Sequence, residues 1–127
     1  PRLIASIAEP MGATWELDHQ RGAPPIVNDE RVAALLAAAS ADVVGADGVG
    51  PTMQSAGGED FSWYGEVAVL GYLRLGVHRP GAPAVDLHSP VFDIDERAVG
   101  IGARILAGAA LAALANPNPN PKPTVLA

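Results

Sequence analysis

His88 is the residue of this chain whose type and setting best suit metal chemistry. It lies in the stretch 86–96, DLHSPVFDIDE, and is followed by a serine and by Pro90. Because Pro90 lacks an amide hydrogen and restricts the residue before it, this segment cannot join a regular hydrogen-bonded ladder. A neutral imidazole nitrogen is a good ligand for zinc or a similar divalent ion. By itself, however, a loop histidine without a partner at ligand spacing is more often an ordinary surface residue.

A second candidate site is the segment 57–61, GGEDF. Its two glycines allow backbone amides to approach a bound anion closely, and a helix start after them adds a positive field. We expect Asp60 to cap that helical turn and Glu59 to be free to point into a cleft. A Gly-Gly turn leading into a short capped helix is an equally good interpretation of these residues: Gly57, Gly58, Glu59, Asp60 and Phe61.

The carboxylates after His88 have two possible roles. Asp86, Asp93 or Asp95 could accept a hydrogen bond from the second ring nitrogen of His88 and orient it. The more economical interpretation is that Asp93 and Glu96 form a D-x-x-E capping box, which places negative charge at the start of the last helix.

Composition limits the possible functions. The chain has 127 residues, about one domain, of which 49% are hydrophobic, and a net charge of −6. The scattered acidic residues argue against nucleic-acid binding, which requires a basic surface. The absence of cysteine excludes a disulfide framework and thiolate ligands in this chain. No uninterrupted apolar run reaches the roughly 18 residues of a membrane span, and we expect a cytoplasmic protein without membrane contact.

The periodicity predicts alternating helices and strands. Residues 2–11 have helical spacing that Pro10 and Gly12 end, and residues 14–19 alternate as a half-buried strand does. A helix capped by Asn28 is expected to run to about Ser40. Its expected buried stripe consists of Val32, Leu35, Leu36 and Ala39.

The second half is expected to add two strands and a long helix. Val43 and Val44 are assigned to a short strand, residues 60–67 to a helical turn and residues 69–77 to a central strand covered on both faces. The last helix should begin at Asp93 and carry one apolar face. That face consists of Val99, Ala103, Leu106, Ala110, Ala113 and Leu114.

This order of elements predicts an α/β layer fold with too few strands to stand alone. The chain begins at Pro1 inside an expected helix, so we expect it to be a fragment of a longer protein. The breaker cluster 21–25, RGAPP, is the expected domain boundary. Residues 116–127 alternate proline with asparagine and are expected to form a disordered or extended tail.

The motifs GGEDFSWY, LGVHRPGAP and LHSPVFDIDE, in this order, resemble the C-terminal part of the M20 metallopeptidase family. Within it they are most similar to the amidohydrolase branch, which includes aminoacylase-like, hippurate-hydrolase-like and auxin-conjugate-hydrolase-like enzymes. The resemblance covers residues 2–115. It implies that residues 21–115 are part of a three-layer α/β/α zinc-exopeptidase-like catalytic domain. Residues 1–20 would be the last helix and strand of the lid, or dimerisation, domain.

The resemblance also implies a function. Such enzymes use two divalent ions (Zn, Mn or Co) to cleave the amide bond of N-acyl amino acids, and they form homodimers. The histidine of HSP is a metal ligand, which maps onto His88, and GGEDF lines the substrate cleft. The family's Cys-x-His motif, its Glu-Glu pair with the catalytic base and another histidine ligand have no counterpart here. The chain would then hold no catalytic residue and be inactive without the N-terminal part of the same protein.

One alternative remains from another functional class. The chain could be a metal-free α/β binding module whose open edge pairs with a partner or with its own copy. A non-catalytic receptor descended from the enzyme is a third interpretation.

Overall fold

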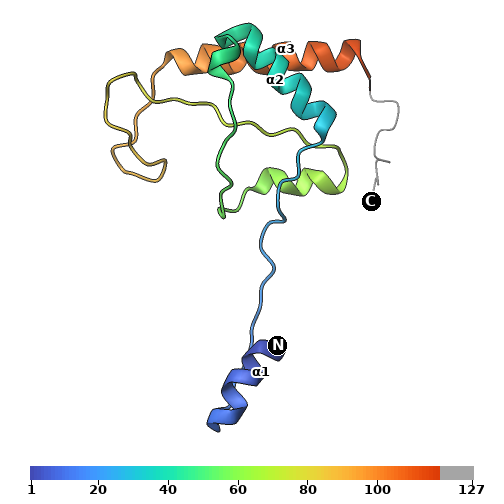
Figure 1. The fold of residues 1–127 in the computed structure, drawn as a ribbon, viewed down its shortest axis with the longest axis vertical. Helices are drawn as coiled ribbons and strands as arrows, with labels where there is room; N and C mark the ends of the chain where they lie inside the picture. The colour runs from blue at the N-terminus through green and yellow to red at the C-terminus, as the bar shows by residue number, and fades with distance from the viewer. Residues whose placement is uncertain (118–127) are drawn as a thin grey trace.

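The computed structural model describes residues 1–117. The tail expected at 116–127 therefore lies almost entirely outside the described residues. Figure 1 shows two longer helices packed together, with irregular segments beneath them and a separate N-terminal helix. The helices are α1 Arg2–Ala8, η1 Glu9–Met11, α2 Glu30–Val44, η2 Ala46–Gly48, η3 Asp60–Glu66 and α3 Arg97–Ala115.

The predicted α/β/α layer fold is wrong for this chain. Between residues 1 and 117 the structure has no sheet, and its only bridge is an isolated parallel one that joins Asn28 to Leu70. Residues 14–19 and 69–77 are not assigned to strands, while Val43 and Val44 continue α2. Alternation along a sequence predicts an extended backbone, but a strand also needs a neighbour to pair its amides and carbonyls. The described residues do not supply that neighbour.

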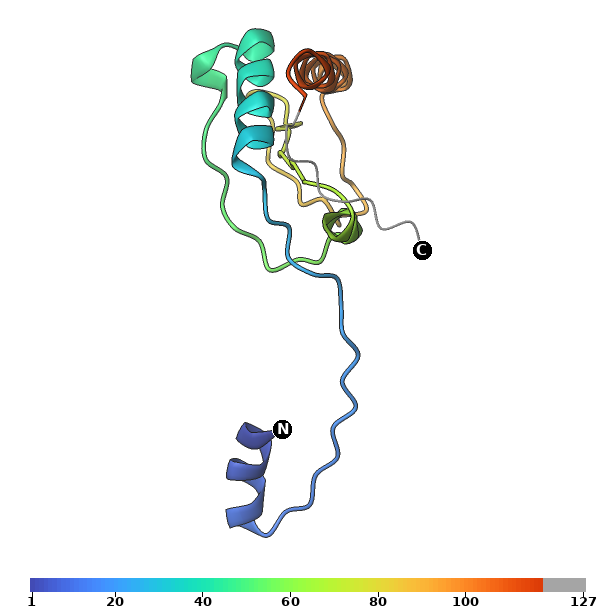
Figure 2. The ribbon, with the colours of Figure 1, turned by 90° about the vertical axis from the view of Figure 1, so that its right-hand side faces the viewer.

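The small core lies between α2, α3 and the segment 69–77. α2 packs directly on α3, which Figure 2 shows nearly end-on beside it. The buried apolar residues come from all three parts: Leu36 and Ala39, Leu70, and Ala98 and Ile105. The stripe predicted for α2 is confirmed, because Leu36 and Ala39 are buried and Val32 and Leu35 are partly buried.

Glycines permit this close packing. A Cβ built on Gly71 would lie 2.3 Å from Cγ1 of Val32, so segment 69–77 can approach α2 only because this position has no side chain. On α3, a Cβ on Gly108 would lie 3.6 Å from Cβ of Ala39, which is an ordinary van der Waals distance. The side of α3 that carries Gly108 therefore lies directly against α2.

The apolar face predicted for α3 is not the buried one. Val99, Leu106 and Leu114 are 65%, 62% and 79% exposed, whereas Ala98 and Ile105 are buried. α3 is apolar on most of its circumference, so the sequence does not mark which side meets α2.

α3 is also long and apolar enough, by length and composition alone, to cross a membrane. The sequence prediction that no segment is a candidate membrane span is therefore corrected. It required an uninterrupted apolar run, and Arg104 interrupts the run in α3. One such helix is weak evidence of a span, since the core helix of a soluble protein has the same composition.

Two predicted helix caps are also displaced along the chain. Asp29, not Asn28, caps α2 by accepting a hydrogen bond from the amide of Val32 at 3.0 Å. α3 begins at Arg97, and the side chain of Asp95, not that of Asp93, accepts the hydrogen bond of its first amide at 3.0 Å. A chain with several acidic residues before a helix offers several caps, and the tertiary path selects one.

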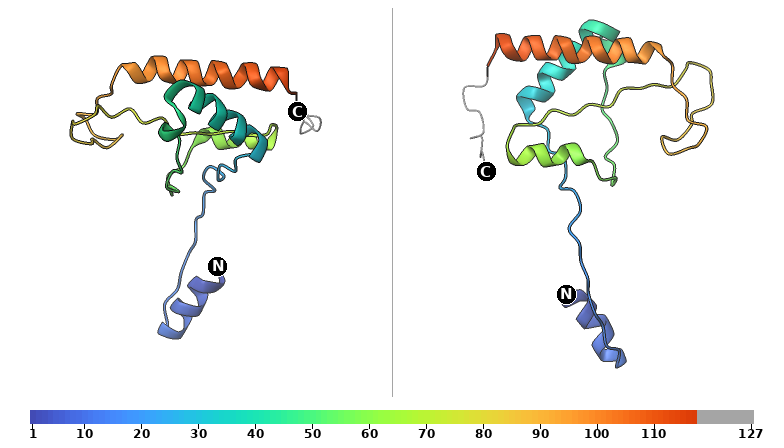
Figure 3. Two further views of the ribbon diagram at one scale, coloured as in Figure 1. Left: turned by 45° about the horizontal axis from the view of Figure 1, so that its top comes forward. Right: turned by 180° about the vertical axis from the view of Figure 1, so that it is seen from behind.

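The N-terminal helix is separate from the others. Figures 1 and 3 show α1 at the far end of an extended segment, and η1 is the one helical element it packs against among the described residues. Its predicted extent is confirmed: α1 and η1 cover residues 2–11, and Gly12 ends them with a φ of 69°. Leu3 and Met11 are 74% and 79% exposed, so its apolar side meets no core.

Candidate functional site

The GGEDF segment forms the start of η3, where Glu59 is the cap. Glu59 Oε1 accepts a hydrogen bond from the amide of Phe61 at 3.2 Å. Its other carboxylate oxygen, Oε2, accepts one from the hydroxyl of Tyr72 at 3.2 Å. The expectation that Asp60 caps the turn while Glu59 points freely into a cleft is therefore corrected. Both oxygens of Glu59 have partners within this chain.

An aromatic cluster surrounds this contact. The ring of Phe61 lies 5.7 Å from that of Tyr64 and 5.8 Å from that of Tyr72, both in tilted arrangements. Burial raises the pKa of the Tyr72 phenol, and its hydrogen bond to the negative charge of Glu59 raises it further, while Arg74 acts in the opposite direction. Tyr72 is therefore a neutral hydrogen-bond donor at neutral pH.

The two glycines are less free than the sequence suggests. The amide of Gly57 donates to Ser55 Oγ at 3.1 Å, so it already has a partner. A Cβ on Gly58 would meet no atom within 4 Å. Gly58 therefore remains the position of the pair where a ligand could approach the backbone.

Asn28 holds the extended segment opposite η3. Its Oδ1 accepts from the amide of Tyr72 at 2.8 Å, and its Nδ2 donates to the carbonyl of Tyr72 at 2.9 Å. The amide of Asp29 donates to the carbonyl of Leu70 at 2.8 Å. One side chain thus makes both hydrogen bonds that a neighbouring strand residue would make. Sequence reasoning placed Asn28 at a helix cap and missed this role, because the partner lies 44 positions away.

His88 lies in a tight turn built by Asp86. The backbone amide of His88 donates to Asp86 Oδ1 at 3.0 Å, and the amide of Ser89 donates to the carbonyl of Asp86, also at 3.0 Å. Asp86 therefore fixes the backbone of the turn and does not orient the ring. The side chain of His88 is exposed.

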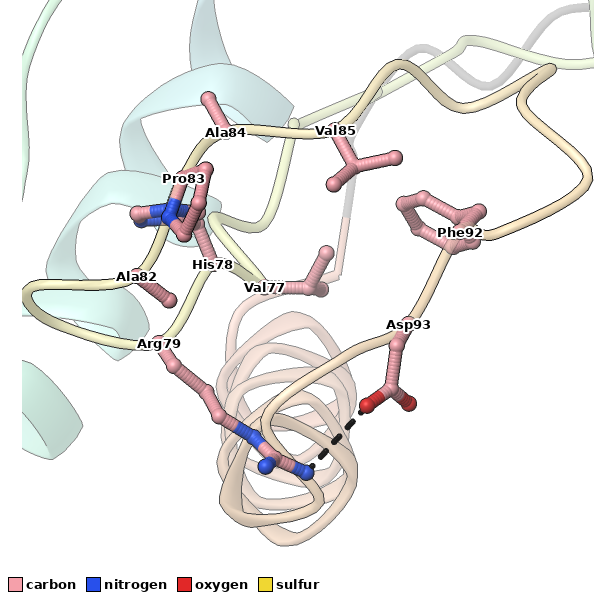
Figure 4. Close-up of a pocket in the computed structure, with 9 residues that line it drawn as sticks. All are labelled: Val77, His78, Arg79, Ala82, Pro83, Ala84, Val85, Phe92 and Asp93. Carbon is pink, nitrogen blue, oxygen red and sulfur yellow. Dashed lines mark ion pairs between the residues drawn. The ribbon is translucent and has the colours of Figure 1, made fainter.

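The stem of the loop that carries this turn is closed by contacts between its two sides. The amide of Asp95 donates to the carbonyl of Val77 at 2.8 Å. Arg79 lies 3.4 Å from the carboxylate of Asp93 and 3.4 Å from the carbonyl of Ile94. Figure 4 shows the Arg79–Asp93 ion pair on one side of a hollow of about 260 Å³. Asp93 is therefore engaged with Arg79.

Asp95 has the largest pKa shift of the loop. The side chain and amide of Arg97 donate hydrogen bonds to its carboxylate and lower its pKa to about 2. This carboxylate is ionised at any ordinary pH. Its partner Arg97 is the first residue of α3, so Asp95 supplies negative charge at the helix start and does not orient His88.

A second hollow, of about 330 Å³, lies where the N-terminal segment meets η3. Its lining includes Asn28, Asp29 and Leu70, together with Ser62 and Gly65 of η3. The hydroxyl of Ser62 is buried and has no hydrogen-bond partner within residues 1–117.

The residues present do not by themselves form a metal site. No group of three His, Asp or Glu side chains that could hold an ion occurs in the part of the chain that the structure describes. A structural or catalytic zinc site needs three or four protein ligands, and His88 offers one. Figure 1 also draws the loop 78–93 and η3 as separate parts of the chain. The ligand role of His88 and the cleft role of 57–61 therefore remain predictions.

Comparison with known proteins supplies the family. The profile of Peptidase family M20/M25/M40 matches residues 5–112. The chain belongs to this family. Among curated relatives, a protein named as an amidohydrolase, YhaA of Bacillus subtilis (strain 168), is 30% identical over 111 residues, which is 86% of this chain and 28% of that protein. A protein named as a hydrolase, sll0100 of Synechocystis sp., is 32% identical over 113 residues, 85% of this chain and 28% of its own length.

A third relative of this M20 segment has a different name. A protein of Rhodococcus jostii named as a glutamate–cysteine ligase is 42% identical over 103 residues, which is 81% of this chain and 13% of that protein. The chain thus spans less than a third of each of these relatives, and most of the ligase-named protein has no counterpart here. No solved structure matches the chain.

Proposed function

We propose that this chain is the C-terminal portion of a metal-dependent amidohydrolase that cleaves the amide bond of N-acyl amino acids or similar small amides. The family profile and the two relatives named as hydrolases support this reaction class. In this proposal the chain is inactive alone, because His88 is its one candidate metal ligand and the family's Glu-Glu pair with the catalytic base has no counterpart in its sequence.

The observation that carries the proposal is the turn at His88. Asp86 holds the backbone of this turn through two hydrogen bonds, and the imidazole remains exposed. A ligand for an ion that other segments complete needs this combination of a fixed backbone and an accessible ring. His88 would be one donor to one of two divalent ions (Zn, Mn or Co).

The remaining parts of the proposal follow the family. Residues 57–61 would line the substrate cleft, and residues 21–115 would belong to the catalytic domain. Residues 1–20 would end the lid domain. The complete protein would be a cytoplasmic homodimer whose N-terminal part supplies the missing ligands, and it would bind neither nucleic acid nor a membrane.

The test is a histidine substitution in the longer protein that contains this segment. His88→Ala should lower the turnover of N-acyl amino acids, in zinc, manganese or cobalt buffers, by at least about 100-fold, since loss of even an outer partner of a metal ligand costs 10- to 100-fold. His19→Ala is the matched control, because His19 is also an exposed histidine outside the helices. Equal activity of the two variants would contradict the proposed role of His88.

A second measurement concerns this chain alone. Metal content after dialysis should be well below one ion per chain, and hydrolysis should be absent. Turnover by the isolated chain would refute the statement that it is incomplete.

A self-association module is the second candidate function. The observation that favours it is the apolar surface left open on α1 and α3, where Leu3, Leu106 and Leu114 are each more than 60% exposed. If this is the function, the longer protein should self-associate in a concentration-dependent way in analytical ultracentrifugation and show no metal-dependent hydrolysis.

A further inference from the structure

Tyr72 lies where two sets of contacts in the central part of the chain meet. Its amide and carbonyl are both bound by the side chain of Asn28, and its hydroxyl donates to Glu59. Its ring also contacts the ring of Phe61. These contacts join parts of the sequence that are 44 and 13 positions from Tyr72.

The hydrogen bonds to the backbone of Tyr72 fix the position from which its side chain extends. Two hydrogen bonds from one asparagine side chain hold the peptide groups of Tyr72 in position and direction, and the bond from Asp29 to Leu70 repeats this two residues earlier. A phenol on a backbone held in this way has few ways to move, so its hydroxyl arrives at Glu59 already oriented.

The hydroxyl then fixes the start of η3. Glu59 uses one carboxylate oxygen for Tyr72 and the other for the amide of Phe61. Its own carbonyl accepts from the amide of Ser62 at 3.0 Å. A hydrogen bond to an ionised carboxylate is stronger than one between neutral groups. Losing the hydroxyl therefore removes one of the two hydrogen bonds that hold the capping carboxylate and weakens its hold on the amide of Phe61.

We propose that Tyr72 is a positioning residue for the segment 57–61, and that Glu59 acts through its two hydrogen bonds instead of touching substrate. The inference rests on the proposed function, in which this segment lines the substrate cleft. Recognition of a ligand would then fall to the open backbone at Gly58 and not to the carboxylate.

Tyr64 provides a matched control. Its ring also packs on Phe61, at nearly the same distance as that of Tyr72. No hydrogen bond of its hydroxyl is found within the described part of the chain, and it is 62% exposed. Tyr72→Phe and Tyr64→Phe thus each remove one hydroxyl from an aromatic neighbour of Phe61, but only Tyr72→Phe removes a contact with Glu59.

The first readout is independent of activity. Amide hydrogen exchange of Phe61, followed by NMR in this chain and in the longer protein, should become about 10-fold faster in Tyr72→Phe, as expected from loss of a hydrogen bond to a charged group. In Tyr64→Phe it should stay within about 2-fold of the unsubstituted protein. Equal exchange in both variants would overturn the proposal.

The second readout separates positioning from general loss of structure. In the longer protein, Tyr72→Phe should raise KM for an N-acyl amino acid about 10-fold and change kcat by less than about 3-fold, because it displaces a cleft wall and not a reacting group. A matching fall in kcat with unchanged KM would refute a positioning role. If the longer protein hydrolyses no such substrate, the proposed function fails, and the exchange measurement still decides the role of Tyr72.

Discussion

Ile105 and Leu106 are neighbours on α3 that the structure treats oppositely, and their substitution tests the observed packing. Ile105 is 2% exposed and Leu106 is 62% exposed. The sequence pattern predicts the reverse, with Leu106 on the buried face. Ile105→Ala and Leu106→Ala each shorten a large aliphatic side chain on the same helix, so helix propensity changes little between them.

The expected magnitudes differ because the burial differs. Replacing a buried isoleucine by alanine costs about 2–5 kcal/mol, from lost apolar burial and from the cavity that remains. Complete burial of a leucine is worth roughly 1.5–3 kcal/mol, so one that keeps about a third of its surface covered should lose less than about 1 kcal/mol. The two variants should therefore differ by about 1–5 kcal/mol in free energy of unfolding, with Ile105→Ala the less stable.

The assay is urea unfolding followed by circular dichroism at 222 nm, which reports the helices. With a slope of about 1–3 kcal/mol/M, the midpoint of Ile105→Ala should lie roughly 1 M below that of Leu106→Ala. Equal midpoints, or a larger loss for Leu106→Ala, would refute the observed orientation of α3 and support the face predicted from the sequence.

Two further perturbations test other contacts. Gly71→Ala should destabilise the chain by about 1–3 kcal/mol in the same urea assay, because its new methyl group would overlap Val32. Gly76 has open space around it, so Gly76→Ala should be neutral or stabilising by up to about 1 kcal/mol. Equal unfolding free energies of the two variants would contradict the packing of segment 69–77 on α2. The pKa of Asp95 is lowered to about 2 in the folded chain, so between pH 4 and pH 2 the unfolded state binds more protons than the folded state. The free energy of unfolding therefore decreases as the pH is lowered through this range. Asp95→Asn should flatten this part of the unfolding free energy measured against pH, and an unchanged slope would show that Arg97 does not hold the carboxylate.

The sequence located the local elements well. The helix over 2–11 with its end at Gly12, the apolar stripe of α2 and the helical turn predicted over residues 60–67 are all found. Each depends on residues within about four positions of one another, so spacing and capping chemistry are sufficient to predict them. The motifs around His88 and GGEDF also indicated the family that the profile match then established.

Only the tertiary structure decided which groups meet across the chain. Asn28 serves Tyr72 and not the start of α2, Glu59 is held by Tyr72, and α3 buries Ile105 and not Leu106. These choices depend on partners tens of positions away, and neighbouring side chains of similar chemistry compete for each of them. The predicted sheet failed for a related reason: a strand is defined by the strand beside it, and alternation in one segment carries no information about whether that neighbour is present.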